Sequence, residues 1–182
     1  TDAGAYDRFL EQAVAARAAW AATPVETRAA FLTRAAALVL EEKDRFVGLL
    51  ADEVGKPAGE AGAEVEASAR MLGFFAGWPL WGRTAQVGVV SGMPEGHVLL
   101  KPKGVAGLIT PWNYPLSSPV QKTAAALVTG NVVVWRPSPV CPRSSALYAE
   151  VLSRAGLPDG VLSVIYETSP ELAKRIVAEW DA

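Results

Sequence analysis

Residues 104–138 read GVAGLITPWNYPLSSPVQKTAAALVTGNVVVWRPS, and they decide which fold we expect. The apolar run 105–109 ends in a turn rich in proline and aromatic residues, and a helical segment follows. Gly130 and Asn131 end that helix before a second, β-branched run at 132–134. Strand, turn, helix and strand in this order form the βαβ unit of a parallel sheet. Both runs are continuously apolar, as in strands covered on both faces, and polar residues follow them at the edge where open α/β sheets bind ligands.

Helices are expected on both sides of this unit, because apolar residues recur there at helical spacing. Before it, we predict helices over 6–22, from Pro24 through Val39, from Asp44 to a stop at 55–57, and from 58 to about 81. After it, we predict a helix over 142–155, a third strand over 161–166, and a last helix that begins at Ser169 and Pro170. The apolar stripes of these helices are interpreted as core packing.

Two helix starts carry capping signals. Thr23 is placed at the N-cap, with Pro24 as the first helical residue and Glu26 at the third position of a capping box. Asp44 is the expected cap of the next helix.

Residues 86–101 change to a period typical of strands. Val87 and Val89 on one side, and Val98 and Leu100 on the other, flank a turn predicted at 93–96. Because a two-stranded hairpin is too small to be stable alone, it should pack on another surface. Its single histidine, His97, has no nearby acid or cysteine and is interpreted as an exposed strand residue.

Composition limits the possible partners. A chain of 182 residues that is 51% hydrophobic fits one domain, or one and a part, with a real core. The net charge of −2 and the dispersed basic residues argue against nucleic acid. No apolar run approaches the roughly 18 residues of a membrane span, and no signal peptide is indicated. One cysteine cannot form an internal disulfide, which suits a cytoplasmic location.

Several spaced motifs in this chain resemble those of the aldehyde dehydrogenase superfamily. They are KGVAGLITPWNYP, the helix with Lys122, GNVVVWRPS, AGLPDGVLSVI, and EVGKP at 53–57 followed by Glu60 and Glu64. The resemblance covers nearly the whole chain, and several motifs in the right order make it specific. It implies an α/β fold: a helical segment (1–85), a β-hairpin (86–103), and the first half of an NAD(P)-binding Rossmann-like domain (104–182). By analogy with doubly wound sheets, the three strands have the order 3-2-1, which leaves an open edge on 105–109.

The same resemblance implies roles for residues at the strand ends. Asn113 matches the asparagine whose amide stabilises the oxyanion formed when a thiolate attacks an aldehyde, and Lys122 matches a lysine on the helix beneath the active site. The residues implied in cofactor binding are Ile109, Thr110, Pro111 and Trp112 on the nicotinamide side and Arg136, Pro137 and Ser138 beside the adenosine ribose.

Residue chemistry alone leaves simpler roles open. Asn113 could cap a helix that starts near Pro115, and Trp112 and Tyr114 could be packing aromatics. Lys122 could be a solvated helix residue, and Arg136 a surface charge at a strand end.

The chain also departs from the family pattern. Pro139 stands where the family commonly has a glutamate that binds the ribose hydroxyls, and Arg136 replaces the usual lysine. Arg136 with Ser138 favours a 2′-phosphate, so we expect NADP rather than NAD. In the family, the nucleophilic cysteine, the glutamate base and the pyrophosphate-binding turn lie further along the chain. Cys141 lies in the loop after the ribose site and is interpreted as an ordinary small residue.

These observations lead to three hypotheses. In the first, a second protein chain carries the C-terminal catalytic half and docks on the open edge, giving a split, hetero-oligomeric oxidoreductase that oxidises a small-molecule aldehyde to an acid. In the second, the chain is a non-catalytic scaffold or interaction subunit. In the third, it is a fragment of a longer enzyme.

Overall fold

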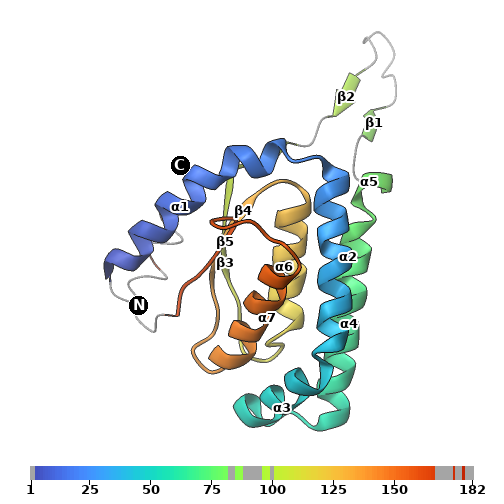
Figure 1. The fold of residues 1–182 in the computed structure, drawn as a ribbon, viewed down its shortest axis with the longest axis vertical. Helices are drawn as coiled ribbons and strands as arrows, with labels where there is room; N and C mark the ends of the chain where they lie inside the picture. The colour runs from blue at the N-terminus through green and yellow to red at the C-terminus, as the bar shows by residue number, and fades with distance from the viewer. Residues whose placement is uncertain are drawn as a thin grey trace.

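The computed structural model describes residues 3–81, 85–87, 96–98, 101–166, 174 and 178. Figure 1 shows helices packed around a small sheet, with a separate two-stranded ladder. The helices are α1 (Ala3–Ala22), α2 (Val25–Glu41), α3 (Lys43–Val54), α4 (Ala58–Ala76), α5 (Trp78–Trp81), α6 (Ser117–Val128) and α7 (Pro142–Arg154). The strands are β1 (Ala85–Val87), β2 (Gly96–Val98), β3 (Val105–Ile109), β4 (Val132–Arg136) and β5 (Leu162–Val164).

The three-stranded sheet confirms the predicted βαβ topology. Its strand order is β3-β4-β5, and both pairings are parallel. Val105 pairs with Val132 and Ile109 with Arg136, so the carboxyl ends of β3 and β4 lie side by side. Among the described strands, β3 pairs only with β4 and therefore forms one border of the sheet. This is the order and the open edge that the resemblance implies.

The two central strands differ in burial. Four of the five residues of β4 are buried, as a strand between two neighbours and two layers should be. In β3, Gly107 and Ile109 are exposed and the other residues are only partly buried. The expectation that both strands are covered on both faces is therefore wrong for β3, because half of its surroundings would have to come from beyond this border.

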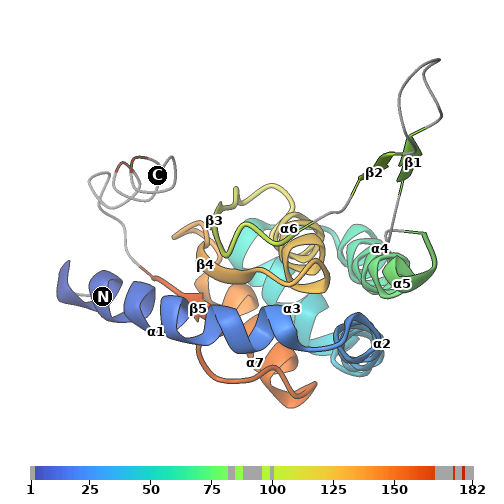
Figure 2. The same cartoon turned by 90° about the horizontal axis from the view of Figure 1, so that it is seen from above.

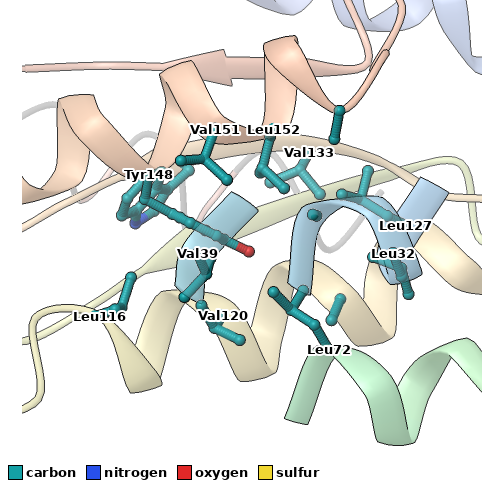
Figure 3. Packing of buried hydrophobic residues seen from close by; sticks show 14 of the residues in the cluster. Leu32, Val39, Leu72, Leu116, Val120, Leu127, Val133, Tyr148, Val151 and Leu152 are labelled. Carbon is teal, nitrogen blue, oxygen red and sulfur yellow. The ribbon is translucent and has the colours of Figure 1, made fainter. Parts of the chain in front are cut away.

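One hydrophobic core joins the N-terminal helices to the sheet. In Figure 3, Leu32 and Val39 of α2 and Leu72 of α4 meet side chains of α6, β4 and α7. These partners are Leu116, Val120, Leu127, Val133, Tyr148, Val151 and Leu152, all of them buried. In Figure 1, α2 and α4 run side by side next to α6, so the helical hairpin covers the helix that follows β3. The predicted segment boundaries at residues 85 and 103 stay predictions.

The helices predicted before residue 156 are found, but both capping predictions are wrong. Pro24 itself is the N-cap of α2, and the Thr23 hydroxyl donates to the Ala19 carbonyl at the end of α1 instead of accepting from α2. Glu42 ends α2 and also begins α3, which places Asp44 inside the first turn. The stop after α3 is confirmed: Gly55 has φ of 67°, and its N–H donates to the Ala51 carbonyl.

Other boundaries need correction as well. The helix predicted to reach about residue 81 ends at Ala76, and α5 follows after Gly77. Gly96, assigned to the hairpin turn, is the first residue of β2. The β1–β2 ladder pairs Gln86 with His97 and stands apart from the helices in Figure 2, so the expected packing surface is not found among the described residues. Of the helix predicted from Ser169, only residues 174 and 178 are described, and both are helical; the rest of that prediction lies outside the described residues.

Candidate functional site

The carboxyl ends of β3 and β4 bring most of the predicted site residues together. The Thr110 amide donates to the Arg136 carbonyl at 3.2 Å, which continues the parallel pairing past the end of β3. From α6, Lys122 reaches back to the same strand, and its Nζ donates to the Ile109 carbonyl at 3.1 Å. Lys122 is therefore tied to the strand end, although its side chain remains exposed.

Two buried hydrogen bonds and one aromatic contact connect this edge of the sheet to the core. The indole N–H of Trp135 donates to the Thr110 hydroxyl at 2.9 Å, and both residues are buried. The Trp135 ring meets Tyr148 edge to face, and the Tyr148 hydroxyl bonds to Thr123 of α6 at 2.7 Å. Burial also raises the pKa of Tyr148 above the usual tyrosine value. The hydroxyl of Thr110 thus fixes the strand end to the core.

The turn after β3 is solvent-facing. Trp112 and Tyr114 each expose 55% of their surface, and Ile109 exposes 36%. Trp112 and Tyr114, for which the sequence leaves a simple packing role open, are therefore not part of the buried core. Exposed aromatic side chains beside a strand end form an apolar surface that a ligand or another chain can cover.

Asn113 does not cap α6. That helix begins at Ser117 with Leu116 at the N-cap, and no side chain of its own start caps it. The cap comes from α4 instead: Glu64 Oε1 accepts the N–H groups of Leu116 and Ser117 at 2.9 and 3.0 Å. A carboxylate at a helix N-terminus satisfies free amides and complements the helix dipole. The Asn113 side chain is left exposed on the turn.

A pocket of about 430 Å³ lies between α4 and this turn. Charged residues line it on the α4 side, namely Lys56, Glu60 and Glu64, and Asn113 and Tyr114 line it on the other. Lys56 pairs with Glu64, and its Nζ also lies 3.4 Å from the Asn113 carbonyl oxygen. The pocket therefore combines a polar wall with the exposed amide of Asn113.

The residues after β4 are more buried than those after β3. Pro137 and Ser138 are buried, and the Ser138 hydroxyl accepts the Val140 N–H at 3.2 Å. Arg136 is partly buried, and its Nε has no hydrogen-bond partner among the described residues although that atom is shielded from solvent. This shielded N–H is therefore an unmet donor in the described part of the structure. Pro139, in contrast, is exposed.

Cys141 has the properties of a structural thiol. It is 1% exposed, stands at the N-cap of α7, and its sulfur lies 3.8 Å from the Ser138 carbonyl. Burial, and then the nearby charge of Glu53, raise the pKa of the Cys141 thiol. Because the thiolate is the reactive form, this environment supports the interpretation that Cys141 is not a nucleophile.

Sequence reasoning gave no individual role to Glu53 or Glu64, two acidic residues of the N-terminal helices. Glu53 accepts the N–H groups of Arg143 and Ser144 at 2.6 and 2.9 Å and so caps α7, as Glu64 caps α6. The available signal was position: Glu64 falls on the apolar stripe of α4, where a charged side chain requires a buried partner.

The described residues were also compared with the requirements of a metal site and of a membrane-spanning helix. No group of three or more His, Cys, Asp or Glu side chains there could hold a metal ion. None of the helices in the same ranges has the length and apolarity to cross a membrane.

Comparison with known proteins agrees with this architecture. A family model described as "Aldehyde dehydrogenase family" matches residues 1–181. The chain is 36% identical over 174 residues to the 2,5-dioxopentanoate dehydrogenase of Saccharolobus solfataricus, covering 93% of this chain and 36% of that protein. It is 38% identical over 166 residues to the chloroplastic betaine aldehyde dehydrogenase of Beta vulgaris, covering 89% and 33%. The chain thus spans about a third of the length of these relatives.

Solved structures show the same fold. An NAD-dependent benzaldehyde dehydrogenase from Corynebacterium glutamicum superposes with a TM-score of 0.84 at 32% identity, covering 94% of this chain and 38% of that one. A succinic semialdehyde dehydrogenase from Streptococcus pyogenes, in complex with NADP+, superposes with a TM-score of 0.88 at 25% identity, covering 98% and 39%. With a family match over residues 1–181 and the fold shared with these structures, the chain belongs to the aldehyde dehydrogenase family.

Proposed function

We propose that this chain is a component of an NAD(P)-dependent aldehyde dehydrogenase that oxidises a small-molecule aldehyde to an acid. The catalytic cysteine and the glutamate base are supplied by another chain. The observation that carries the proposal is the exposed side chain of Asn113, which projects from the turn at the ligand edge of the sheet, beside the pocket under α4. An amide N–H in that place can donate to an oxygen that becomes negative when a thiolate attacks an aldehyde.

The residues at the strand ends fit the ribose side of a dinucleotide. Arg136 ends β4 opposite Ile109, and a guanidinium in that place suits a 2′-phosphate, which favours NADP over NAD. Ser138 follows Arg136 in the same loop, and residues 109–112 form the neighbouring wall. When bound, the nicotinamide supplies a hydride acceptor. The residues of this chain bind and orient that cofactor, and Lys122 holds the Ile109 carbonyl in place.

The dinucleotide phosphates have no helix N-terminus to bind in this part of the fold. Free amides at helix starts are the usual phosphate sites of such sheets. Here Glu64 occupies the start of α6 and Glu53 occupies the start of α7. A phosphate brought to either helix would meet a carboxylate. The phosphate contacts must therefore come from residues outside these two helices, as the proposal of a completing half requires.

The border of the sheet supports the same conclusion. Strand β3 pairs with β4 on one side, and its other side has no partner among the described strands. Gly107 and Ile109 are exposed there. An apolar strand with unpaired backbone groups is a template for a further strand. A catalytic half that adds its strand to β3 would also bring its cysteine towards Asn113.

The test begins with the composition of the native complex, isolated through a tag on this chain and measured by mass spectrometry. We expect a second polypeptide that carries the catalytic cysteine, together with NAD(P)H formation when an aldehyde is added. Recovery of this chain alone, with no dinucleotide binding, would support the non-catalytic scaffold. Recovery of one long polypeptide would leave the reaction in place and overturn supply by another chain.

Two variants then test the role of Asn113 in the active complex. Asn113→Ala should lower kcat about 10²- to 10³-fold, the usual effect of losing an oxyanion donor. Gln121→Ala removes an equally exposed amide on α6 and should leave kcat unchanged. Full activity of Asn113→Ala would refute the proposed role.

A further inference from the structure

We infer that Lys56 and Glu64 are positioning residues that set the conformation of the turn carrying Asn113. This inference rests on the proposed function for the importance of Asn113, but the contacts that carry it do not. Lys56 lies between α3 and α4, and Glu64 lies in α4, so both come from the N-terminal helices and neither belongs to the sheet.

The two side chains contact the second half of the turn and the start of α6. Lys56 Nζ lies 3.4 Å from the Asn113 carbonyl oxygen and 4.7 Å from the centre of the Tyr114 ring, a cation–π distance. Glu64 Oε1 accepts the N–H groups of Leu116 and Ser117 at 2.9 and 3.0 Å. The ion pair therefore contacts this part of the chain from Asn113 to the first residue of α6.

The ion pair is itself buried and constrained. The Glu64 side chain is 2% exposed and the Lys56 side chain 12% exposed, and the two are in direct contact. Glu64 uses Oε2 for Lys56 and Oε1 for the turn, so one carboxylate joins both contacts. Ser68, one helical turn later, donates to the Glu64 carbonyl at 2.8 Å and lies 3.1 Å from the Ser117 hydroxyl. A satisfied buried network of this kind specifies one geometry.

The Asn113 side chain depends on this geometry. It is exposed, and it makes no hydrogen bond of its own within the described part of the chain. The position of its Cβ is set by the backbone of the turn, and the Asn113 backbone carbonyl is the atom that Lys56 contacts. A small displacement of a catalytic donor is enough to reduce its effect, because stabilisation of an oxyanion requires donors placed in advance.

A matched pair of variants separates this role from a general effect of losing a lysine. Lys43 of α3 pairs with Glu66 of α4 at 2.7 Å, but this pair is exposed and does not touch the turn. Lys56→Met and Lys43→Met therefore each remove one positive charge from an ion pair with α4. Lys56→Arg retains the cation and can still reach Glu64 and the Asn113 carbonyl.

The experiment measures hydrogen exchange of the Leu116 and Ser117 amides in the full chain by NMR. We expect exchange about tenfold faster in Lys56→Met and about tenfold to hundredfold faster in Glu64→Ala, as for loss of charge-assisted hydrogen bonds. Lys43→Met should match the unchanged protein, and Lys56→Arg should restore slow exchange. Unchanged exchange in Lys56→Met, or an equal increase throughout β4, would overturn the inference.

A second measurement connects the turn to the reaction. In the active complex, Lys56→Met should lower kcat while the Kd of the dinucleotide stays constant, because the pair contacts the turn from Asn113 onward and not at residues 109–112 or 136–138. A fall in dinucleotide affinity with kcat preserved would overturn the positioning role. If the unchanged complex shows no oxidation of aldehydes, the proposed function fails, while the exchange measurement still decides whether the pair sets the turn.

Discussion

Replacing Arg28 with methionine should strongly destabilise the chain. Arg28 is only 8% exposed, and its Nε donates to the Val128 carbonyl at the end of α6 at 3.0 Å. Its Nη1 donates to three carbonyls at the end of α1, those of Trp20, Ala21 and Thr23. Carbonyls at a helix end lack the next turn of amides to bind them, although that of Trp20 also accepts the Thr23 N–H at 3.1 Å. The positive charge of Arg28 also complements two helix dipoles.

The magnitude follows from the number of protons available. Nε and Nη1 carry three N–H protons, and a hydrogen bond that involves a charged group contributes about 1.5–3 kcal/mol. Part of this gain is offset because burial disfavours the charged form and lowers the pKa of Arg28. Methionine also fills some of the space. We therefore expect a net loss of about 3–5 kcal/mol, as for other broken buried charge contacts.

Arg34 offers a matched control on the same helix. Its Nε donates to one carbonyl, that of Ala155 at the end of α7, at 2.9 Å. Arg34→Met should therefore cost about 1 kcal/mol. Arg28→Lys keeps the charge but cannot reach both helix ends, so its loss should fall between the two.

Urea unfolding followed by far-UV circular dichroism provides the assay. With a slope m of about 2 kcal/mol/M, Arg28→Met should lower the midpoint by about 1.5–2.5 M and Arg34→Met by about 0.5 M. The slope should be the same in all variants if the unfolded state is unaltered. Equal midpoint shifts for Arg28→Met and Arg34→Met, or a loss below about 1 kcal/mol for Arg28→Met, would refute the reasoning.

Three further predictions concern other parts of the fold. Because burial raises the pKa of Tyr148, the unfolded chain loses this proton at lower pH than the folded one, so the free energy of unfolding should fall as pH rises above the usual tyrosine value of 10.0. Tyr148→Phe should flatten this alkaline fall in urea midpoints and cost about 1 kcal/mol near neutral pH through the lost bond to Thr123; an unchanged slope would contradict this. Gly160→Ala should lower the free energy of unfolding by about 1–3 kcal/mol, because φ is 78° and a Cβ would lie 3.1 Å from a backbone oxygen of α1, whereas Gly73→Ala, in open space on α4, should raise it by about 0.5–1 kcal/mol. Cys141 should react with a thiol reagent at mildly alkaline pH only after urea is added, and rapid labelling of the folded chain would show that its burial is wrong.

Much of the fold could be predicted from sequence because its signals are local. The apolar run of β3, the break at Gly130 and the β-branched run of β4 lie within one stretch, and short continuous runs between breakers predict a parallel βαβ unit. Gly55 predicted the end of α3 correctly, because its positive φ belongs to that one residue. The local signals failed at helix starts: Thr23 chose the carbonyl of α1 over the amides of α2, although the capping pattern is present.

The candidate site was predicted in part. The resemblance placed Asn113, Lys122 and Arg136 at one edge of the sheet, and the register of β3 with β4 shows why they meet there. Their chemical roles remain predictions. The contacts of Lys56 and Glu64 with the turn were not predicted, because they join residues 52 to 57 positions apart in the chain.

The sequence by itself determined the order of helices and strands, the parallel pairing and the family, because these depend on patterns within short stretches and on motifs in a fixed order. Only the tertiary structure decided which carboxylate caps which helix. Glu53 of α3 and Glu64 of α4 accept hydrogen bonds from amides at the starts of α7 and α6. Which carboxylate meets which helix start depends on which surfaces pack together. The packing also decided that β4 is covered while β3 is left at the border, a difference that two equally apolar runs do not encode.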